Sequence, residues 1–311
     1  MEKIIIIAGP TAAGKTAAAA ALALAVGGEV VSADSMQIYK YMDIGTAKPT
    51  ESEKRGVPHH LVNELFPDEE YSAAAFRRMA DVRIREIIAR DRVPIVAGGS
   101  GFYIRALLSG EGFEDGAGAD GALREAFAET ARERGAGYLH ALLAEADPNA
   151  AAAIHPNNVK RVIRALEYNA ATGGTISGRG AAQLSAPPAY DASVFILAMD
   201  RAALYARVDA RVDRMFAAGL VGEVRGLLAM GYSRRLVSMQ GLGYKETAAH
   251  IEDGLTEAEA RELIKLRTRR FAKRQITWFS RQLAGEVIDA EAFGGADGIA
   301  EHILQITRTN I

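Results

Sequence analysis

Hydrophobic and polar positions follow one another along this chain in blocks that predict short buried strands separated by helices. Four apolar runs are typical of strands in a buried parallel sheet, at residues 4–8, 29–33, 94–97 and 194–198. Between the first three runs, residues 16–26 and 72–90 have helical patterns. This alternation predicts a doubly wound α/β domain.

A different pattern separates the third run from the fourth. Residues 110–122 read GEGFEDGAGADGA, a turn-rich stretch that indicates a domain boundary or a mobile loop. The residues that follow have only helix and loop patterns, so we expect a helical insertion domain at 113–190. The parallel-sheet core, flanked by helices, then comprises residues 1–112 and 191–311.

One helix of the expected insertion has an apolar face and a basic face. Its apolar residues recur at helical spacing, at Val159, Val162, Ile163 and Leu166. Its basic residues, on the opposite face, are Lys160, Arg161 and Arg164.

Composition narrows the class of protein. The 311 residues carry a net charge of −2 and include no cysteine, which excludes disulfides, thiolate zinc sites and a cysteine nucleophile. The N-terminal apolar run ends at Gly9 and Pro10, too early for a signal peptide or a membrane span. We therefore expect a cytoplasmic monomer that does not contact membranes.

Charge is unevenly distributed along the chain. Residues 265–281 are densely basic, whereas 286–298 are acidic and Gly-rich and are expected to form a poorly ordered tail. Because the net charge gives no overall positive field, an anionic partner would have to be bound locally.

A phosphate-binding loop follows the first predicted strand. Residues 9–16 read GPTAAGKT and fit the pattern GxxxxGK[ST], in which backbone N–H groups surround a phosphate. Gly9 and Gly14 allow the tight turn, Lys15 adds a positive charge, and the Thr16 hydroxyl is positioned for Mg²⁺. A chance Gly-rich turn is the alternative, which the strand before and the helix after argue against. The loop indicates a phosphate but not the molecule that carries it.

Two further motifs follow the second and third predicted strands. Asp34, in SADSMQIYKYMDIGTAKP (32–49), should face the same crevice as the phosphate loop, because ligands bind beyond the carboxyl ends of parallel strands. It could be a base that faces an organic substrate or a cap of the following turn, and the residues alone do not decide between these. The third strand ends in Gly98 and Gly99, where the backbone could approach a ligand and Ser100 could donate a hydrogen bond to it. Alternatively, the two glycines only allow a tight turn from the strand into a helix.

Taken in order, seven segments resemble the bacterial tRNA dimethylallyltransferase family, also called tRNA isopentenyltransferase. They are GPTAAGKT, SADSMQIYKYMDIGTAKP, VPHHL (57–61), GGSGFYIRAL (98–107), IHPNNVKRVIRALE (154–167), QGLGYKE (240–246) and RRFAKRQITWF (269–279). The resemblance implies a P-loop-type α/β core with an insertion that binds the tRNA anticodon stem-loop. It also implies transfer of a dimethylallyl group from dimethylallyl diphosphate to N6 of adenosine 37, next to the anticodon, in tRNAs that read U-starting codons. Diphosphate would be released, and Mg²⁺ would be required.

The resemblance assigns roles to individual residues. Asp34 would act as the base that removes the N6 proton, while Lys15, Thr16 and Arg207 act on the diphosphate. The expected diphosphate contacts are Gly9, Pro10, Thr11, Ala12, Ala13, Gly14, Lys15, Thr16, Arg207 and, as the alternative arginine, Arg211; Thr16 is the expected Mg²⁺ ligand. The expected tRNA contacts are Asp34, Ser35, Met36, Gln37, Ser100, Arg124, Lys160, Arg161, Val162, Ile163, Arg164, Met239, Gln240, Gly241, Leu242, Gly243, Tyr244, Arg270 and Arg274.

Some alternatives stay open. The arginines at 207, 211 and 214 share one stripe of a helix and, without the resemblance, would be interpreted as a solvated face with helix ion pairs. The phosphate loop also suits an ATP-dependent small-molecule kinase with the insertion as its lid, and a non-catalytic RNA-binding protein is a third possibility. ATP turnover would identify the kinase, and RNA binding without product would identify the RNA-binding protein.

Overall fold

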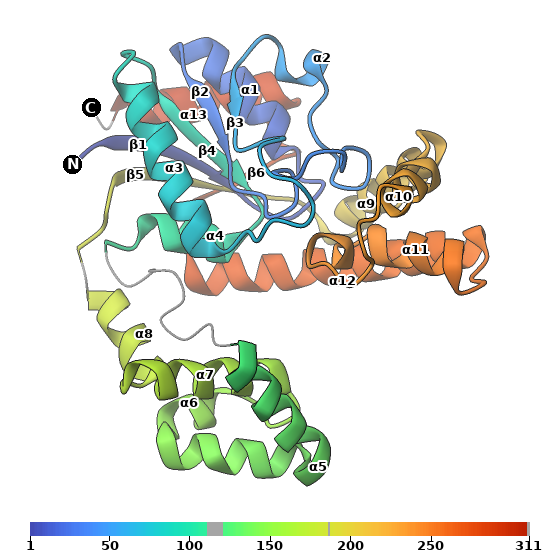
Figure 1. Ribbon diagram of the computed structural model, residues 1–311. Helices are drawn as coiled ribbons and strands as arrows, with labels where there is room; N and C mark the ends of the chain where they lie inside the picture. The colour runs from blue at the N-terminus through green and yellow to red at the C-terminus, as the bar shows by residue number, and fades with distance from the viewer. Residues whose placement is uncertain (111–120, 186, 310–311) are drawn as a thin grey trace. The chain divides into compact units, whose positions relative to one another are not determined.

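A six-stranded parallel sheet forms the centre of the larger part of the chain (Figure 1). The structure is a computed structural model that describes residues 1–110, 121–185 and 187–309. The order of the strands across the sheet is β3-β2-β4-β1-β5-β6, and all neighbours are parallel. The strands are β1 (Lys3–Ala8), β2 (Glu29–Ser32), β3 (His59–His60), β4 (Pro94–Gly98), β5 (Asp191–Ala198) and β6 (Glu286–Asp289).

Helices cover both faces of this sheet. The helices of this part are α1 (Lys15–Val26), α2 (Glu51–Lys54), α3 (Ala73–Ile88), α4 (Gly101–Leu108), α9 (Arg201–Ala217), α10 (Leu220–Ala229), α11 (Tyr244–Glu252), α12 (Glu257–Gln282) and α13 (Ala296–Thr309), with a short 3₁₀ helix η1 (Ser238–Gln240). Side chains that point to one face, such as Ile5, Ile7 and Phe195, pack with α1 and α13 in a single core. On the other face α3 packs against β2, β4 and α4.

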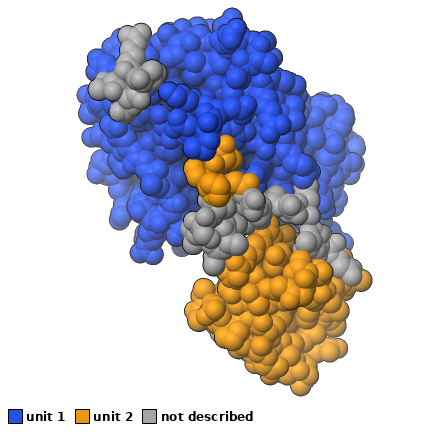
Figure 2. Space-filling model, turned by 90° about the vertical axis from the view of Figure 1, so that its left-hand side faces the viewer, with its two compact units in different colours: residues 1–108, 190–311 blue, residues 109–189 orange. Residues whose placement is uncertain are grey.

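The chain divides into two compact units (Figure 2). Unit 1 comprises 1–108 and 190–311 and contains the sheet, whereas unit 2 comprises 109–189. Unit 2 is made of the helices α5 (Gly121–Ala146), α6 (Pro148–Ala153), α7 (Val159–Thr172) and α8 (Ile176–Ser185). Gly135 interrupts α5 with a non-helical backbone (φ 85°, ψ 160°), so α5 is two helical segments joined at a kink.

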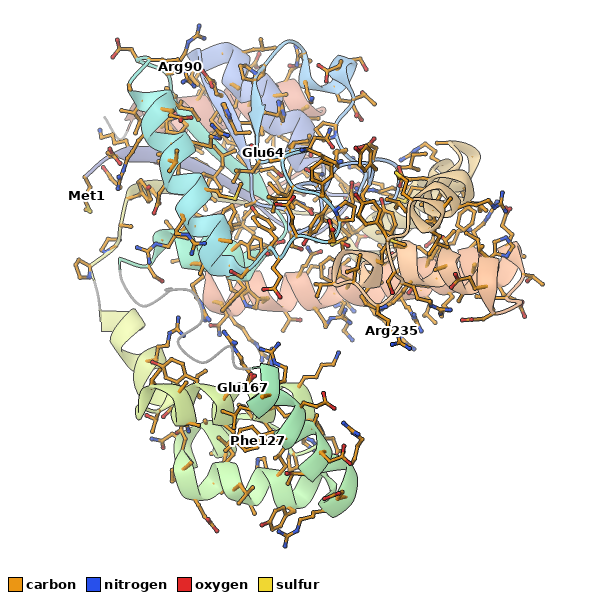
Figure 3. All side chains as sticks on the ribbon, viewed as in Figure 1. Met1, Glu64, Arg90, Phe127, Glu167 and Arg235 are labelled. Carbon is orange, nitrogen blue, oxygen red and sulfur yellow. The ribbon has the colours of Figure 1, made fainter. Side chains whose placement is uncertain are left out.

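Unit 2 has a small apolar core of its own. Buried side chains of α5, α6 and α7 form it, among them Leu139, Leu143 and Val162. Beside this core the carboxylate of Glu167, labelled in Figure 3, is buried and accepts a hydrogen bond from Arg124 Nε at 2.8 Å. The turn-rich stretch at 111–120 lies outside the described residues.

The four predicted strands and the α/β class are confirmed, but the expectation of a poorly ordered tail at 286–298 is wrong. Residues 286–289 form the edge strand β6 beside β5. The helix α13 follows, and its Ile299 and Ile303 are buried against the core under α1. The acidic, Gly-rich composition suggested disorder. The sequence pattern could not show that this short strand pairs with a neighbouring strand in the folded sheet.

Among the described residues, no helix has the length and apolarity of a membrane span.

Candidate active site

The phosphate loop connects the end of β1 to the start of α1. Gly9 has a φ of 143°, and a Cβ there would lie 2.6 Å from the Leu197 carbonyl oxygen, so a side chain is excluded. Gly14 precedes α1 in the left-handed region and provides no side-chain cap. The first N–H groups of α1 therefore have no partner within the helix, and with the helix dipole they form an anion-binding site.

Two cations lie at this loop. Lys15 Nζ donates to the Pro10 carbonyl at 2.7 Å, and Arg211 Nη1 donates to Thr11 Oγ1 at 3.1 Å. Burial and the nearby Arg211 cation lower the pKa of Lys15 to about 7, although the charge of Asp34 opposes this. Burial also lowers the pKa of Arg211. Two desolvated cations side by side favour an anion between them.

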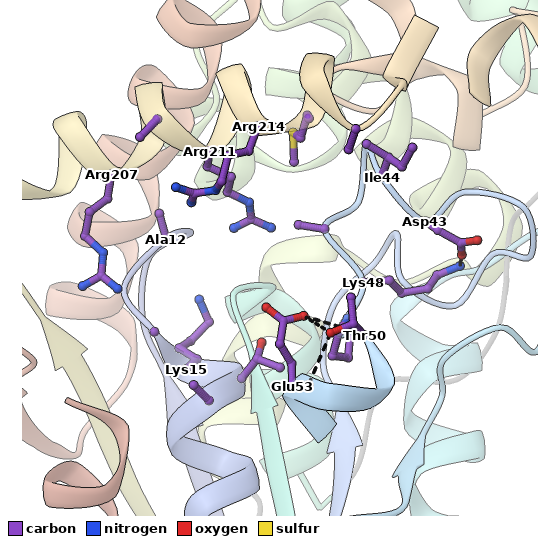
Figure 4. A pocket seen from close by; sticks show the side chains of 18 of the residues that line it. Ala12, Lys15, Asp43, Ile44, Lys48, Thr50, Glu53, Arg207, Arg211 and Arg214 are labelled. Atoms are coloured by element: carbon purple, nitrogen blue, oxygen red, sulfur yellow. Dashed lines mark hydrogen bonds and ion pairs between the residues drawn. The ribbon is translucent and has the colours of Figure 1, made fainter. Parts of the chain in front are cut away.

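A cavity of about 920 Å³ opens in front of the loop (Figure 4). Arg207, Arg211 and Arg214 of α9 line one side of it, and Lys15 and Glu53 line another (Figure 4). One Nη atom of Arg207 lies 3.7 Å from the position that a Cβ of Gly14 would occupy. The stripe of arginines on α9 thus lines this cavity.

A second cavity, of about 360 Å³, lies beside the first. The residues that line both cavities are Lys15, Thr16, Arg211 and Met215. Asp34, Ser35, Met36, Gln37 and Ser100 all line the second cavity. The phosphate loop is therefore shared by two spaces, one rich in arginine and one that contains a carboxylate.

Asp34 caps a turn and also lines the second cavity. Its Oδ1 accepts from the Met36 N–H at 2.9 Å and from the Gln37 N–H at 3.4 Å, so it caps the turn after β2. Among the described residues Oδ2 has no hydrogen-bond partner, so this oxygen remains available in the cavity. The Ser100 hydroxyl accepts from the Ser35 N–H at 3.1 Å and ties the end of β4 to the same turn.

The sequence did not reveal how the loop at 43–45 is held. Glu223 of α10 accepts hydrogen bonds from the N–H groups of Asp43, Ile44 and Gly45 at 2.8, 2.7 and 3.0 Å. The Tyr244 hydroxyl donates to the same carboxylate at 2.7 Å. This loop lines both cavities and Tyr244 itself borders the second, so Glu223 and Tyr244 together hold part of the wall of the site. No sequence signal marks this contact, since its partners are about 180 residues apart.

The Thr16 hydroxyl is a side chain that could hold Mg²⁺ at this site. It lies in the first turn of α1 beside Lys15 and lines both cavities. Among the described residues, no group of three His, Asp or Glu side chains could hold a metal ion. One hydroxyl supplemented by phosphate oxygens and water suits Mg²⁺, which binds few protein ligands at phosphate sites.

The structure separates the predicted tRNA-binding residues into exposed and buried ones. Lys160, Arg161 and Arg164 are exposed on α7. Val162 and Ile163, at 0% and 7% exposure, belong to the core of unit 2, so their side chains are not on the surface, and their predicted contact with tRNA stays a prediction. The apolar face that makes α7 a helix of a packed unit is the face that removes them from solvent.

The segment at 239–244 also combines buried and exposed residues. The side chains of Met239 and Tyr244 are fully buried, and Gly243 is the buried residue before α11. These side chains are therefore not on the outer surface; Tyr244 supports the 43–45 loop through Glu223 and borders the second cavity, and contact of this segment with tRNA stays a prediction. Gln240 is exposed, and Gly241 and Leu242 line the second cavity.

The remaining predicted contacts are Arg124 of unit 2, whose Nε donates to Glu167 at 2.8 Å, and two arginines of α12. Arg270 and Arg274 are exposed on α12, and Arg274 lines the second cavity. Other cations of this helix are paired, including Arg267 with Glu246 at 2.6 Å and Arg269 with Asp209 at 2.6 Å.

The comparisons with known proteins identify the family. A family model described as IPP transferase matches residues 37–282. The chain belongs to this family. The tRNA dimethylallyltransferase of Lachnoclostridium phytofermentans is 49% identical over 91% of this chain and 90% of its own length. That of Alkaliphilus oremlandii is 44% identical over 98% and 96%.

Solved structures of IPP transferases have the same fold. The full-length tRNA isopentenylpyrophosphate transferase of Bacillus halodurans is 39% identical, with a TM-score of 0.72, over 100% of this chain and 96% of its own. A eukaryotic dimethylallyltransferase described as acting on tRNA is 29% identical, with a TM-score of 0.84, over 100% and 79%. The family resemblance of the sequence is confirmed, and the kinase alternative is not favoured.

Proposed function

We propose that this IPP transferase moves a dimethylallyl group from dimethylallyl diphosphate to N6 of an adenosine in tRNA. The observation that supports this most directly is that one phosphate loop borders two cavities. The first offers Lys15 and the arginines of α9 to a diphosphate, and the second offers the Asp34 carboxylate to an acceptor. A kinase needs no carboxylate aimed at an aromatic amine in this place.

Asp34 is the proposed general base. N6 of adenine attacks C1 of the dimethylallyl group, the C1–O bond to the diphosphate breaks, and the N6 proton passes to Oδ2 of Asp34. An exocyclic amino group is a weak nucleophile, so a positioned carboxylate that removes its proton during attack increases the rate by about 10²–10⁴-fold. The turn hydrogen bonds to Oδ1 hold the carboxylate in place for this step.

The diphosphate accumulates negative charge as C1–O breaks. The N–H groups at the start of α1, Lys15 and Arg211 are fixed around the loop before the reaction starts. Loss of one such donor costs about a hundredfold or more in rate. Arg211 borders both cavities, whereas Arg207 borders only the first. We therefore assign Arg211 to the phosphate whose oxygen is bonded to C1, and Arg207 to the terminal phosphate.

Mg²⁺ held by Thr16 and by phosphate oxygens would neutralise part of the diphosphate charge.

The protein itself binds the acceptor tRNA through exposed basic residues. We propose Lys160, Arg161 and Arg164 on α7 and Arg270 and Arg274 on α12 for its phosphates, because these exposed cations have no ion-pair partner within the part of the chain that the structure describes. Arg124 adds a contact only if it leaves Glu167.

The acceptor base must leave its stack to reach Asp34. Ser35, Met36, Gln37 and Ser100 line the space where it would lie, together with Gly241 and Leu242. We propose adenosine 37 of tRNAs that read U-starting codons as the target. We further propose that the protein acts as a monomer in the cytoplasm.

Mass spectrometry of nucleosides tests this proposal. Purified protein, Mg²⁺, dimethylallyl diphosphate and unmodified tRNA are expected to yield N6-dimethylallyladenosine at position 37. A parallel reaction with ATP in place of the isoprenoid is expected to yield none. ADP formation in that reaction without prenylation in the first would contradict the proposal, and RNA binding without product would indicate a non-catalytic role.

A further inference from the structure

A buried glutamine on the basic helix α12 joins the two loops that form the site. Gln275 is 6% exposed. Its Oε1 accepts from the Thr11 N–H at 2.9 Å, and its Nε2 donates to the Gly99 carbonyl at 2.8 Å. The side chain thus bridges the loop after β1 and the loop after β4, which lie 264 and 176 residues away in the sequence.

The chemistry of a glutamine amide fits this position. One side must accept from an N–H and the other must donate to a carbonyl, and a neutral amide offers both. The backbone leaves room for nothing larger at Gly99, because a Cβ there would lie 2.5 Å from Gln275 Nε2 and 3.6 Å from Lys15 Nζ. The close approach of the amide therefore requires the second glycine of the GGSG segment.

Thr11 is the point at which this bridge reaches the phosphate loop. Its N–H is committed to Gln275, and its Oγ1 accepts from Arg211 at 3.1 Å. Two helices therefore hold Thr11: α12 binds the backbone N–H of Thr11, and α9 binds the side-chain hydroxyl of Thr11. The Thr11 N–H is not available to a phosphate, so the diphosphate must be bound by the N–H groups that follow.

The same stretch of α12 also lines the acceptor cavity. Phe271, Arg274 and Gln275 itself border the space that contains Asp34. One turn later the indole ring of Trp278 fills the space above Gly101 at the start of α4, where a Cβ would meet it at 2.2 Å. α12 is thus packed rigidly against the loops that it bridges.

We propose that Gln275 is a positioning residue that sets the shape of the phosphate loop and thereby its affinity for diphosphate. This inference rests on the proposed function for the identity of the donor. It assigns to the basic helix a second task besides contact with tRNA. No atom of Gln275 needs to touch the diphosphate for this effect.

The test compares Gln275→Met with Gln282→Met. Methionine has a similar volume but makes neither hydrogen bond, and Gln282 is an exposed glutamine at the end of the same helix, outside both cavities. Calorimetry measures the Kd for inorganic diphosphate with Mg²⁺ in the absence of tRNA, and filter binding measures the Kd for tRNA. The loss of a hydrogen bond to a fixed backbone group costs about 1.4 kcal/mol. Gln275→Met is therefore expected to raise the Kd for diphosphate about tenfold. Its tRNA affinity and all affinities of Gln282→Met should stay unchanged.

A double-mutant cycle with Thr11→Val separates positioning from general stability. Gln275→Met removes the bond to the backbone N–H of residue 11, and Thr11→Val removes the bond from Arg211 to its side chain. If both bonds are needed to position the same residue, the double variant is expected to lose less affinity than the product of the two single losses. Wild-type diphosphate affinity in Gln275→Met would overturn the proposal. Equal losses of diphosphate and tRNA affinity with a lowered Tm would also overturn it, since they indicate a structural role. Inorganic diphosphate as the probe keeps this result independent of the prenylation assay, whose failure would bear only on the proposed function.

Discussion

Raising the pH from 7 to 9 is expected to weaken diphosphate binding to the tRNA-free enzyme by about fiftyfold, because Lys15 must be protonated to hold the anion. Burial and Arg211 lower the pKa of Lys15 to about 7 in the ligand-free site. A bound diphosphate places opposite charge beside the ammonium and raises its pKa again. The free site therefore loses the proton as pH rises, and binding restores it.

The magnitude follows from the two protonation states. With a pKa of about 7, Lys15 is about half charged at pH 7 and about 1% charged at pH 9. If only the charged form binds, the ratio of these fractions gives the fiftyfold loss. At pH 8 about 0.9 proton should be taken up for each diphosphate bound.

Isothermal titration calorimetry at pH 8 measures this uptake directly. The observed enthalpy is compared between buffers of different ionisation enthalpy, and its slope is the number of protons bound. Dimethylallyl diphosphate is the ligand for this titration, because the second proton of a phosphate ester leaves with a pKa of about 6 and the ligand then contributes little at pH 8.

The matched control is Lys15→Arg, whose guanidinium stays charged throughout this range. Its binding should show no proton uptake and little change between pH 7 and 9. Uptake near zero in the wild-type protein, with an affinity that is flat over this range, would refute the reasoning. Uptake that persists in Lys15→Arg would assign the proton to another group.

Three further predictions concern other parts of the site. Asp34→Asn keeps the turn hydrogen bonds but cannot accept the proton, so kcat should fall by about a hundredfold or more with tRNA affinity unchanged. A wild-type rate constant in single-turnover assays would exclude Asp34 as the base. Glu223→Ala removes the acceptor of three N–H groups and of the Tyr244 hydroxyl, so the free energy of unfolding should fall by about 2–3 kcal/mol in urea titrations, and an unchanged midpoint would contradict its role. Arg270→Ala should lower the salt dependence of tRNA binding by about one unit of slope, whereas the paired Arg267 should not; equal effects would contradict this division of the helix.

Local patterns predicted much of the fold. The run before Gly9 and the Ala-rich helix after Thr16 form β1 and α1 because strand and helix periodicities are properties of adjacent residues. β3 was missed because two residues, His59 and His60, are too short to show a period. β6 was missed because an edge strand depends on its neighbour rather than on its own composition.

The site divides in the same way. The phosphate loop, the carboxylate at Asp34 and the basic character of α12 could be read from the amino-acid sequence alone, since each depends on contiguous residues. The packing of the folded chain is what pairs Arg267 and Arg269 with carboxylates, buries Met239 and Tyr244, and lets Gln275 and Glu223 hold loops far from them in the chain. These contacts join residues that local propensity cannot relate, because they form only when the packed helices bring both partners together.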